Sequence, residues 1–181
     1  MNQTILVLGD SISAAYGIQR EQGWVALLQE RLDESGFGAR VENASTSGWT
    51  TSDGLAQLPR LIDYHRPDIV VIELGGNDGL RGLPLARIRA NLITMIETSK
   101  AGGARVLVVG MEVSPNLGPR YTTAFENLYR EVADRMRTAL VPSLFAHFDE
   151  TMLQRDGIHP NADSQPVILD NIWPELVPML R

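Results

Sequence analysis

Short, almost uninterrupted apolar runs recur along the chain, and longer segments lie between them in which apolar residues return every three or four positions. Continuous runs are typical of strands that are buried on both faces, whereas the longer spacing is typical of helices with one buried face. The runs predict five strands, at residues 4–8, 40–43, 69–74, 106–109 and 140–141. This alternation favours a parallel sheet with right-handed connections and helices on both faces.

Three of the intervening segments carry a clear helical stripe. They span residues 24–32, 85–96 and 125–136. Two weaker stripes lie at residues 51–65, where Pro59 is expected to kink or restart the helix, and at residues 169–176, which contain Pro174. No linker or repeat divides the chain, so residues 1–181 are predicted to form a single α/β domain. Its expected architecture is a three-layer α/β/α sandwich around a five-stranded parallel, flavodoxin-like sheet.

Composition and charge narrow the possible functions. The chain has 181 residues, of which 44% are hydrophobic and 21% are charged, as in ordinary globular domains. Its 16 Lys and Arg residues against 22 Asp and Glu residues give a net charge of -6, so nucleic acid is not expected as a partner. The chain has no cysteine, which excludes disulfides, thiolate metal sites and a cysteine nucleophile.

The first apolar run gives no indication of membrane insertion. It comprises only residues 5–9 and has no basic flank, so it is too short for a signal peptide or a membrane span. We therefore do not expect the protein to be an integral membrane protein, and we see no targeting segment in this sequence. The cytoplasm and the periplasm both stay open as compartments.

The segments that follow the predicted strands carry the candidate chemistry, because ligands of open α/β sheets bind beyond the carboxyl ends of the strands. Four such segments are unusual, at residues 9–13, 43–48, 75–79 and 156–160. Taken singly, each has a plain explanation. Ser11 can cap a helix, Asn77 is a common turn residue, and Gly48 can supply a positive φ.

The pair Asp156 and His159 is a stronger indication of catalysis. A spacing of three residues in a turn lets the carboxylate reach one imidazole nitrogen while the other nitrogen points away, toward a nucleophile such as Ser11. The same pair could instead cap the last helix or bind a metal, although no second histidine or acidic cluster accompanies it. His65 and His147 are expected to be loop or surface residues.

The four segments, in this order, resemble the sequence blocks of the GDSL, or SGNH, hydrolase superfamily. These blocks are Gly9-Asp10-Ser11-Ile12, Gly48, Gly75-Gly76-Asn77-Asp78 and Asp156-x-x-His159. Their spacing across nearly the whole chain is similar to the small bacterial branch of thioesterase I/protease I/lysophospholipase type, also described as arylesterases. Ile12 replaces the leucine of the family name, an apolar exchange that should not affect catalysis.

The resemblance implies a role for each matching residue. Ser11 would be the nucleophile, His159 its base and Asp156 the group that orients the base. The backbone N–H groups of Ser11 and Gly48 and the side-chain amide of Asn77 would form the oxyanion hole.

Acyl transfer chemistry agrees with these roles, because each preorganised oxyanion donor typically contributes about 3 to 4 kcal/mol. Gly48 is expected to be needed for close approach of its amide, and Asn77 because it donates without adding charge. A helix after Ser11 is expected to add its positive N-terminal dipole. Because Ser13 stands where α/β-hydrolases have the last glycine of their nucleophile elbow, a looser turn is expected.

Substrate choice is expected to reside in two loops, residues 79–83 and 112–117. Candidate apolar walls are Leu80, Leu83, Val113 and Leu117, although such side chains can equally cover the core or lie scattered on the surface. Asp10, beside the nucleophile, is also predicted to line the substrate site. Gly79 and Gly82 would permit motion of the first loop.

The sequence thus predicts a serine esterase or thioesterase for short to medium acyl chains, with aryl esters, acyl-CoA and lysophospholipids as candidate substrates. We expect no cofactor, no metal and a monomer, and the resemblance favours a periplasmic or secreted protein. A carbohydrate acetylesterase is an alternative, although only Trp49, Tyr16 and Tyr121 could stack on sugars near this edge. A flavodoxin-like module that binds phosphate or flavin is a further alternative, but it would leave Asp156 and His159 without a role.

Overall fold

The computed structural model describes residues 3–180 and contains one five-stranded sheet. Its strands are β1 (Gln3–Gly9), β2 (Ala39–Asn43), β3 (Ile69–Glu73), β4 (Arg105–Val109) and β5 (Ala139–Val141). Every neighbouring pair is parallel, in the order β2-β1-β3-β4-β5, which is the flavodoxin-like order. Each predicted strand is present to within one residue at either end. Met1, Asn2 and Arg181 of the predicted domain lie outside the described residues.

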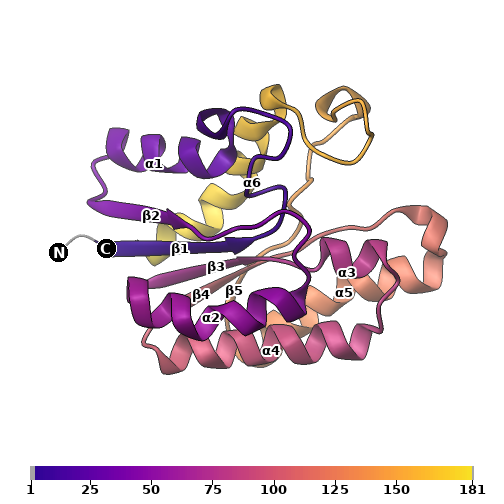
Figure 1. Cartoon of the computed structure of the whole chain (residues 1–181), viewed down its shortest axis with the longest axis horizontal. Helices are drawn as coiled ribbons and strands as arrows, with labels where there is room; N and C mark the ends of the chain where they lie inside the picture. Colours follow the sequence, from indigo (N-terminus) through magenta and orange to yellow (C-terminus); the bar gives the residue numbers. More distant parts are fainter. Residues whose placement is uncertain (1–2, 181) are drawn as a thin grey trace.

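Helices cover both faces of the sheet, so the predicted three-layer α/β/α sandwich is confirmed. The helices are α1 (Trp24–Glu34), α2 (Thr51–His65), α3 (Gly76–Leu80), α4 (Leu85–Ala101), α5 (Pro119–Met136) and α6 (Gln165–Leu176). Helices α1 and α6 pack together on one face, and α2, α4 and α5 lie on the other (Figure 1). Among residues 3–180, no helix combines the length and the apolar character that crossing a bilayer requires.

Burial on both sheet faces explains the continuous apolar runs. All five residues of β3 are buried, and β1 and β4 are nearly as well covered. The bulkiest fully buried side chains, Trp24, Tyr129 and Phe125, come from helices on opposite faces. Because burying a large side chain of this kind contributes about 1.5 to 3 kcal/mol, the two helical layers hold the sheet rigidly from both sides.

Proline and glycine lie at the two ends of α4, whereas Pro59 lies inside α2. Pro84 precedes α4, and Gly102 and Gly103 follow its end, where Gly103 adopts a φ of 88°. Helix α2 nevertheless continues through Pro59 without a restart. Pro59 is exposed, so the backbone hydrogen bond that it cannot donate is lost on the side of the helix that water can reach.

The strand order creates a gap at the carboxyl ends of β1 and β3. The chain leaves β1 toward α1 on one face, and it leaves β3 toward α4 on the other face. Neighbouring connections therefore diverge between these two strands, which is where ligands bind in open α/β folds. The segments that begin at Asp10 and at Leu74 border this gap.

Candidate active site

Ser11 lies in a compact turn directly after β1. The Asp10 carboxylate accepts a hydrogen bond from the Ile12 N–H at 3.0 Å, and the Ser11 carbonyl accepts one from the Tyr16 N–H at 3.0 Å. Residues 11–17 form turns rather than a helix, and α1 begins only at Trp24. The expected helix dipole behind Ser11 is therefore wrong, and the expected looseness of this turn relative to a nucleophile elbow stays a prediction.

Asp156 and His159 form a compact pair in the loop before α6. The Oδ1 atom of Asp156 accepts hydrogen bonds from the backbone N–H groups of His159 at 3.0 Å and Ile158 at 2.9 Å, while Oδ2 lies 2.7 Å from His159 Nδ1. The hydrogen bond from the His159 backbone, then its side chain and the Ile158 backbone, lower the pKa of Asp156 to about 2. The carboxylate thus stays charged at neutral pH and holds the imidazole by Nδ1.

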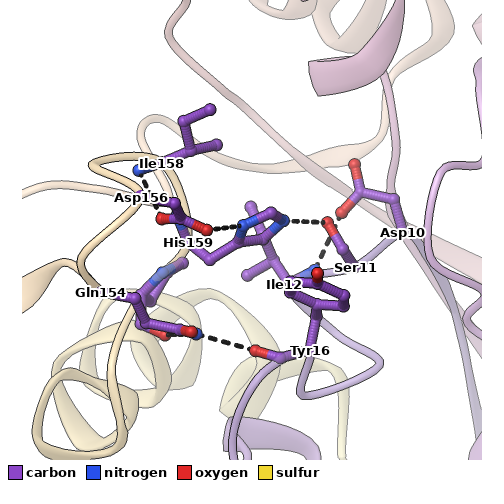
Figure 2. A network of polar contacts seen from close by, with 9 residues as sticks. Asp10, Ser11, Ile12, Tyr16, Gln154, Asp156, Ile158 and His159 are labelled. Carbon is purple, nitrogen blue, oxygen red and sulfur yellow. Dashed lines mark hydrogen bonds and ion pairs between the residues drawn. The ribbon is translucent and has the colours of Figure 1, made fainter.

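The other ring nitrogen of His159 reaches Ser11. Nε2 lies 3.0 Å from Ser11 Oγ, so hydroxyl, imidazole and carboxylate form one continuous chain (Figure 2). The turn of Asp156 does not cap α6, whose N-cap residue Ser164 makes no side-chain cap; Asn161 caps the short 3-10 helix Ala162–Ser164 that precedes α6. Among residues 3–180, no group of three or more His, Asp or Glu side chains could hold a metal ion.

Two residues that the sequence did not single out for this role support the His159 loop. The ring of Tyr16 lies 4.5 Å from the His159 ring, centroid to centroid. The side-chain amide of Gln154 donates to the carbonyls of Tyr16 at 2.8 Å and Pro160 at 2.9 Å, and so ties the loop to the turn of Ser11 (Figure 2). Tyr16 therefore lies against the His159 ring while remaining 52% exposed.

The candidate oxyanion donors come from three separate segments. Asn77 Nδ2 donates to the Trp49 carbonyl at 2.8 Å, and its contact with Asp10 Oδ2 is long, at 3.4 Å, so one amide hydrogen is available to a substrate. Within residues 3–180, the backbone N–H groups of Ser11 and Gly48 have no acceptor. Asn77 lies in α3, a short helix that the sequence pattern did not predict.

Gly48 has the positive φ that its loop position allows, and the close approach of its amide to a substrate stays a prediction. A Cβ atom built on it would meet nothing within 4 Å, so close packing does not exclude a side chain. Its φ of 84° does, because this left-handed conformation strains other residues. Gly48 is exposed, and its loop is tied to the site by the bond between Trp49 and Asn77.

A cavity of about 420 Å³ opens beside Ser11 and His159. Of the predicted substrate residues, it is lined by Asp10, Leu80 and Val113. Its apolar lining also includes Ile12, Met111, Pro115, Phe145 and Ile158. Its size lies within the range of small-molecule sites in proteins.

Three predicted substrate residues do not line the cavity. Gly79 is buried behind it, where an added Cβ would collide with Val113 and lie 2.9 Å from the Phe125 ring. Leu83 is half-buried, and its carbonyl accepts from the Tyr121 hydroxyl at 2.8 Å. Leu117 is also half-buried, in the turn before α5. Glycine and leucine at these positions therefore shape the loops rather than face the cavity.

Burial alters the acidity of Asp10, which is only 2% exposed. Loss of hydration raises its pKa from the ordinary 3.8 to about 6, against the lowering effects of the Ile12 N–H and the nearby His159. A carboxyl group that protonates this readily adds little negative charge beside the nucleophile in mildly acidic solution.

A hydroxyl, an imidazole and a carboxylate joined in this order are the working groups of serine hydrolases, and the fold and the site together place the protein in that class. The chain belongs to the GDSL-like lipase/acylhydrolase family, whose model matches residues 7–165. It is therefore an enzyme that hydrolyses ester bonds.

Three curated relatives match almost the whole chain. Esterase TesA of Pseudomonas aeruginosa is 52% identical over 180 residues, which are 98% of this chain and 90% of the relative. An arylesterase of Vibrio mimicus is 44% identical, over 97% and 89% of the two chains. Thioesterase 1/protease 1/lysophospholipase L1 of Escherichia coli is 38% identical, over 98% and 85%.

Solved structures agree with this assignment. The crystal structure of TesA has a TM-score of 0.95 and 52% identity, covering 98% of this chain and 100% of that one. The psychrotrophic esterase EstA from Pseudoalteromonas sp., in a structure inhibited by monoethylphosphonate, has a TM-score of 0.92 and 36% identity, covering 98% of each chain.

Proposed function

We propose that the enzyme hydrolyses carboxylic esters and acyl thioesters through an acyl-enzyme on Ser11. The observation that carries this proposal is the 3.0 Å contact between His159 Nε2 and Ser11 Oγ, with the opposite ring nitrogen held by Asp156. His159 takes the hydroxyl proton as Ser11 attacks the carbonyl carbon, and returns it to the leaving alcohol or thiol. Water then attacks the acyl-enzyme by the same route and releases the acid.

The negative charge of each tetrahedral intermediate falls on the former carbonyl oxygen. We propose the N–H groups of Ser11 and Gly48 and the amide of Asn77 as its donors. The second amide hydrogen of Asn77, which makes only a long 3.4 Å contact with Asp10 Oδ2, supports this assignment. Fixed donors of this kind need no reorientation as the charge develops, so they stabilise the transition state more than the ground state.

Replacing Asn77 by alanine is expected to lower kcat by about 100- to 1000-fold, because one oxyanion donor is lost. KM should change less than threefold, since the donor acts mainly on the transition state. Steady-state kinetics with p-nitrophenyl butyrate measure both constants. Asn116→Ala, a change at an exposed loop position, is the control and should leave kcat unaltered. A kcat of Asn77→Ala within threefold of wild type would remove this residue from the oxyanion hole.

The substrate class follows from the cavity and from the relatives. We propose acyl groups of short to medium length, because the lining is mainly apolar and Leu80, Val113 and Ile158 face the space beside Ser11. The relatives are named as an esterase, an arylesterase and a thioesterase with lysophospholipase activity. These names support aryl esters, acyl-CoA and lysophospholipids as candidate substrates.

A series of p-nitrophenyl esters and acyl-CoA thioesters of increasing chain length tests this proposal. We expect kcat/KM to rise up to roughly fourfold per methylene while the cavity fills, since each buried methylene contributes about 0.8 kcal/mol. Leu80→Ala should lower kcat/KM for octanoyl esters about fivefold and for acetyl esters less than twofold. Tyr64→Ala is the control, because Tyr64 is 82% exposed on α2. Activity on acetylated sugars alone would overturn the proposal.

We also propose that the enzyme acts as a monomer outside the cytoplasm, because members of the resembled branch are often periplasmic. Cell fractionation and light scattering of the purified protein test these two points separately.

A further inference from the structure

Glu73 is a buried acidic residue that the proposed mechanism does not use. It ends β3, opposite Gly9 of β1, and its side chain is fully buried. Within residues 3–180, no arginine, lysine or histidine forms an ion pair with it. An unpaired carboxyl group in a protein core is costly, so its contacts call for an explanation.

Those contacts hold the nucleophile turn on both sides of Ser11. Glu73 Oε2 accepts the hydroxyl of Ser13 at 2.5 Å and, more weakly, the N–H of Asp10 at 3.3 Å. The Ser13 hydroxyl in turn accepts the indole N–H of Trp24 at 3.2 Å. Glu73 thus holds Asp10, the residue before Ser11, and Ser13, the second residue after it.

Gly9 makes this contact possible. A Cβ atom built on Gly9 would lie 2.6 Å from Glu73 Oε2 and 2.6 Å from Ser13 Oγ. Any side chain there would separate the carboxyl group from the turn. The glycine that opens the first sequence block therefore provides the space through which Glu73 reaches the nucleophile turn.

The surroundings of Glu73 favour its uncharged form. Burial and the neighbouring Asp10 raise the pKa of Glu73 well above its ordinary 4.5, against the hydrogen bonds from Ser13 and Asp10. Its other oxygen, Oε1, has no partner in the described part of the chain. The titratable groups that face it are Asp10, from the turn after β1, and Tyr129, from α5, and neither supplies a positive charge.

We propose that Glu73 is a positioning residue that holds Ser11 in its attacking geometry through Ser13 and the Asp10 backbone. This inference rests on the proposed role of Ser11.

Three variants test the positioning role: Glu73→Gln, Glu73→Leu and Ser13→Ala. Glutamine keeps an oxygen that can accept both hydrogen bonds, so kcat should stay within threefold of wild type. Leucine removes the acceptor, and kcat should fall on the order of 100-fold, as expected for misplacement of a reacting atom by about 1 Å. Ser13→Ala should lower kcat about tenfold, and KM should change less than twofold in every variant.

The rate at which a fluorophosphonate labels Ser11 should follow kcat, since labelling needs the same attacking geometry. Full kcat in folded Glu73→Leu would overturn the proposal, and so would a loss in Glu73→Gln as large as that in Glu73→Leu. If Glu73→Leu does not fold, Ser13→Ala decides, because an unchanged kcat and labelling rate would refute the positioning role. Failure of wild-type protein to be labelled at Ser11 would instead refute the proposed function.

The raised pKa of Glu73 predicts how the free energy of unfolding depends on pH. Because folding raises the pKa of Glu73 above 4.5, the folded protein keeps a proton that the unfolded chain releases above this pH. The contribution of Glu73 is therefore fully present below pH 4.5 and is lost as pH rises through the folded pKa. Urea unfolding of Glu73→Gln from pH 4 to pH 8 should show a smaller loss of stability with rising pH than wild type. If the free energy of unfolding changes equally with pH in wild type and in Glu73→Gln, folding does not raise the pKa of Glu73.

Discussion

Replacing Ser11 by alanine is expected to lower kcat on the order of 10⁶-fold, with the protein still folded. The substitution removes the hydroxyl that His159 Nε2 contacts, and a water molecule cannot replace a nucleophile that is held in place. Kinetics with p-nitrophenyl butyrate measure the loss, and circular dichroism checks the fold. A residual rate above the uncatalysed reaction is expected, because the oxyanion donors remain.

Covalent labelling identifies the nucleophile independently of turnover. A fluorophosphonate should modify wild-type protein once, at Ser11, and peptide mass spectrometry locates the adduct. Ser47→Ala, at an exposed position of the neighbouring loop, is the matched control and should label and turn over normally. Stoichiometric labelling at any other residue would show that the nucleophile has been misassigned.

His159→Asn should be almost as damaging as the loss of Ser11, because the hydroxyl then has no base to take its proton. We expect kcat to fall by about 10⁵- to 10⁶-fold and labelling by a fluorophosphonate to slow in parallel. The other two histidines serve as internal comparisons. His147→Asn is the matched control, since His147 is exposed with a φ of 67° that asparagine tolerates.

Two results would contradict the role of His159. One is a variant that labels and turns over at the wild-type rate, and the other is an equal loss in His147→Asn. His65 offers no alternative base at this site, because it ends α2 and its Nδ1 lies 3.7 Å from Glu42 of β2.

The sheet could be predicted from the sequence because its strands are buried on both faces. The run Ile69 to Leu74 is apolar at every position except Glu73, so no alternation obscured it. Candidate site residues could also be named, since Ser11 and Asn77 come just after glycines at the ends of β1 and β3, and His159 lies three residues after Asp156. The structure brings Ser11, His159 and Asp156 together, and their catalytic roles remain predictions until the variants are measured.

Other parts of the site could not be predicted, because they depend on packing between distant segments. Nothing in the residue pattern links Tyr16 to His159 or Gln154 to the carbonyl of Tyr16. Leu80 and Leu83 look equivalent in sequence, yet only Leu80 lines the cavity. Helix α3 is five residues long, too short for a stripe to identify it.

Asp156 and His159, the proposed acid and base, lie on one loop and contact each other within a span of four residues. A displacement of that loop would therefore move both groups together. Their partner Ser11 is separated from His159 by 148 positions in the chain. The proposed proton transfer thus depends on the contact between two loops distant in sequence, which the Gln154 side chain helps to hold.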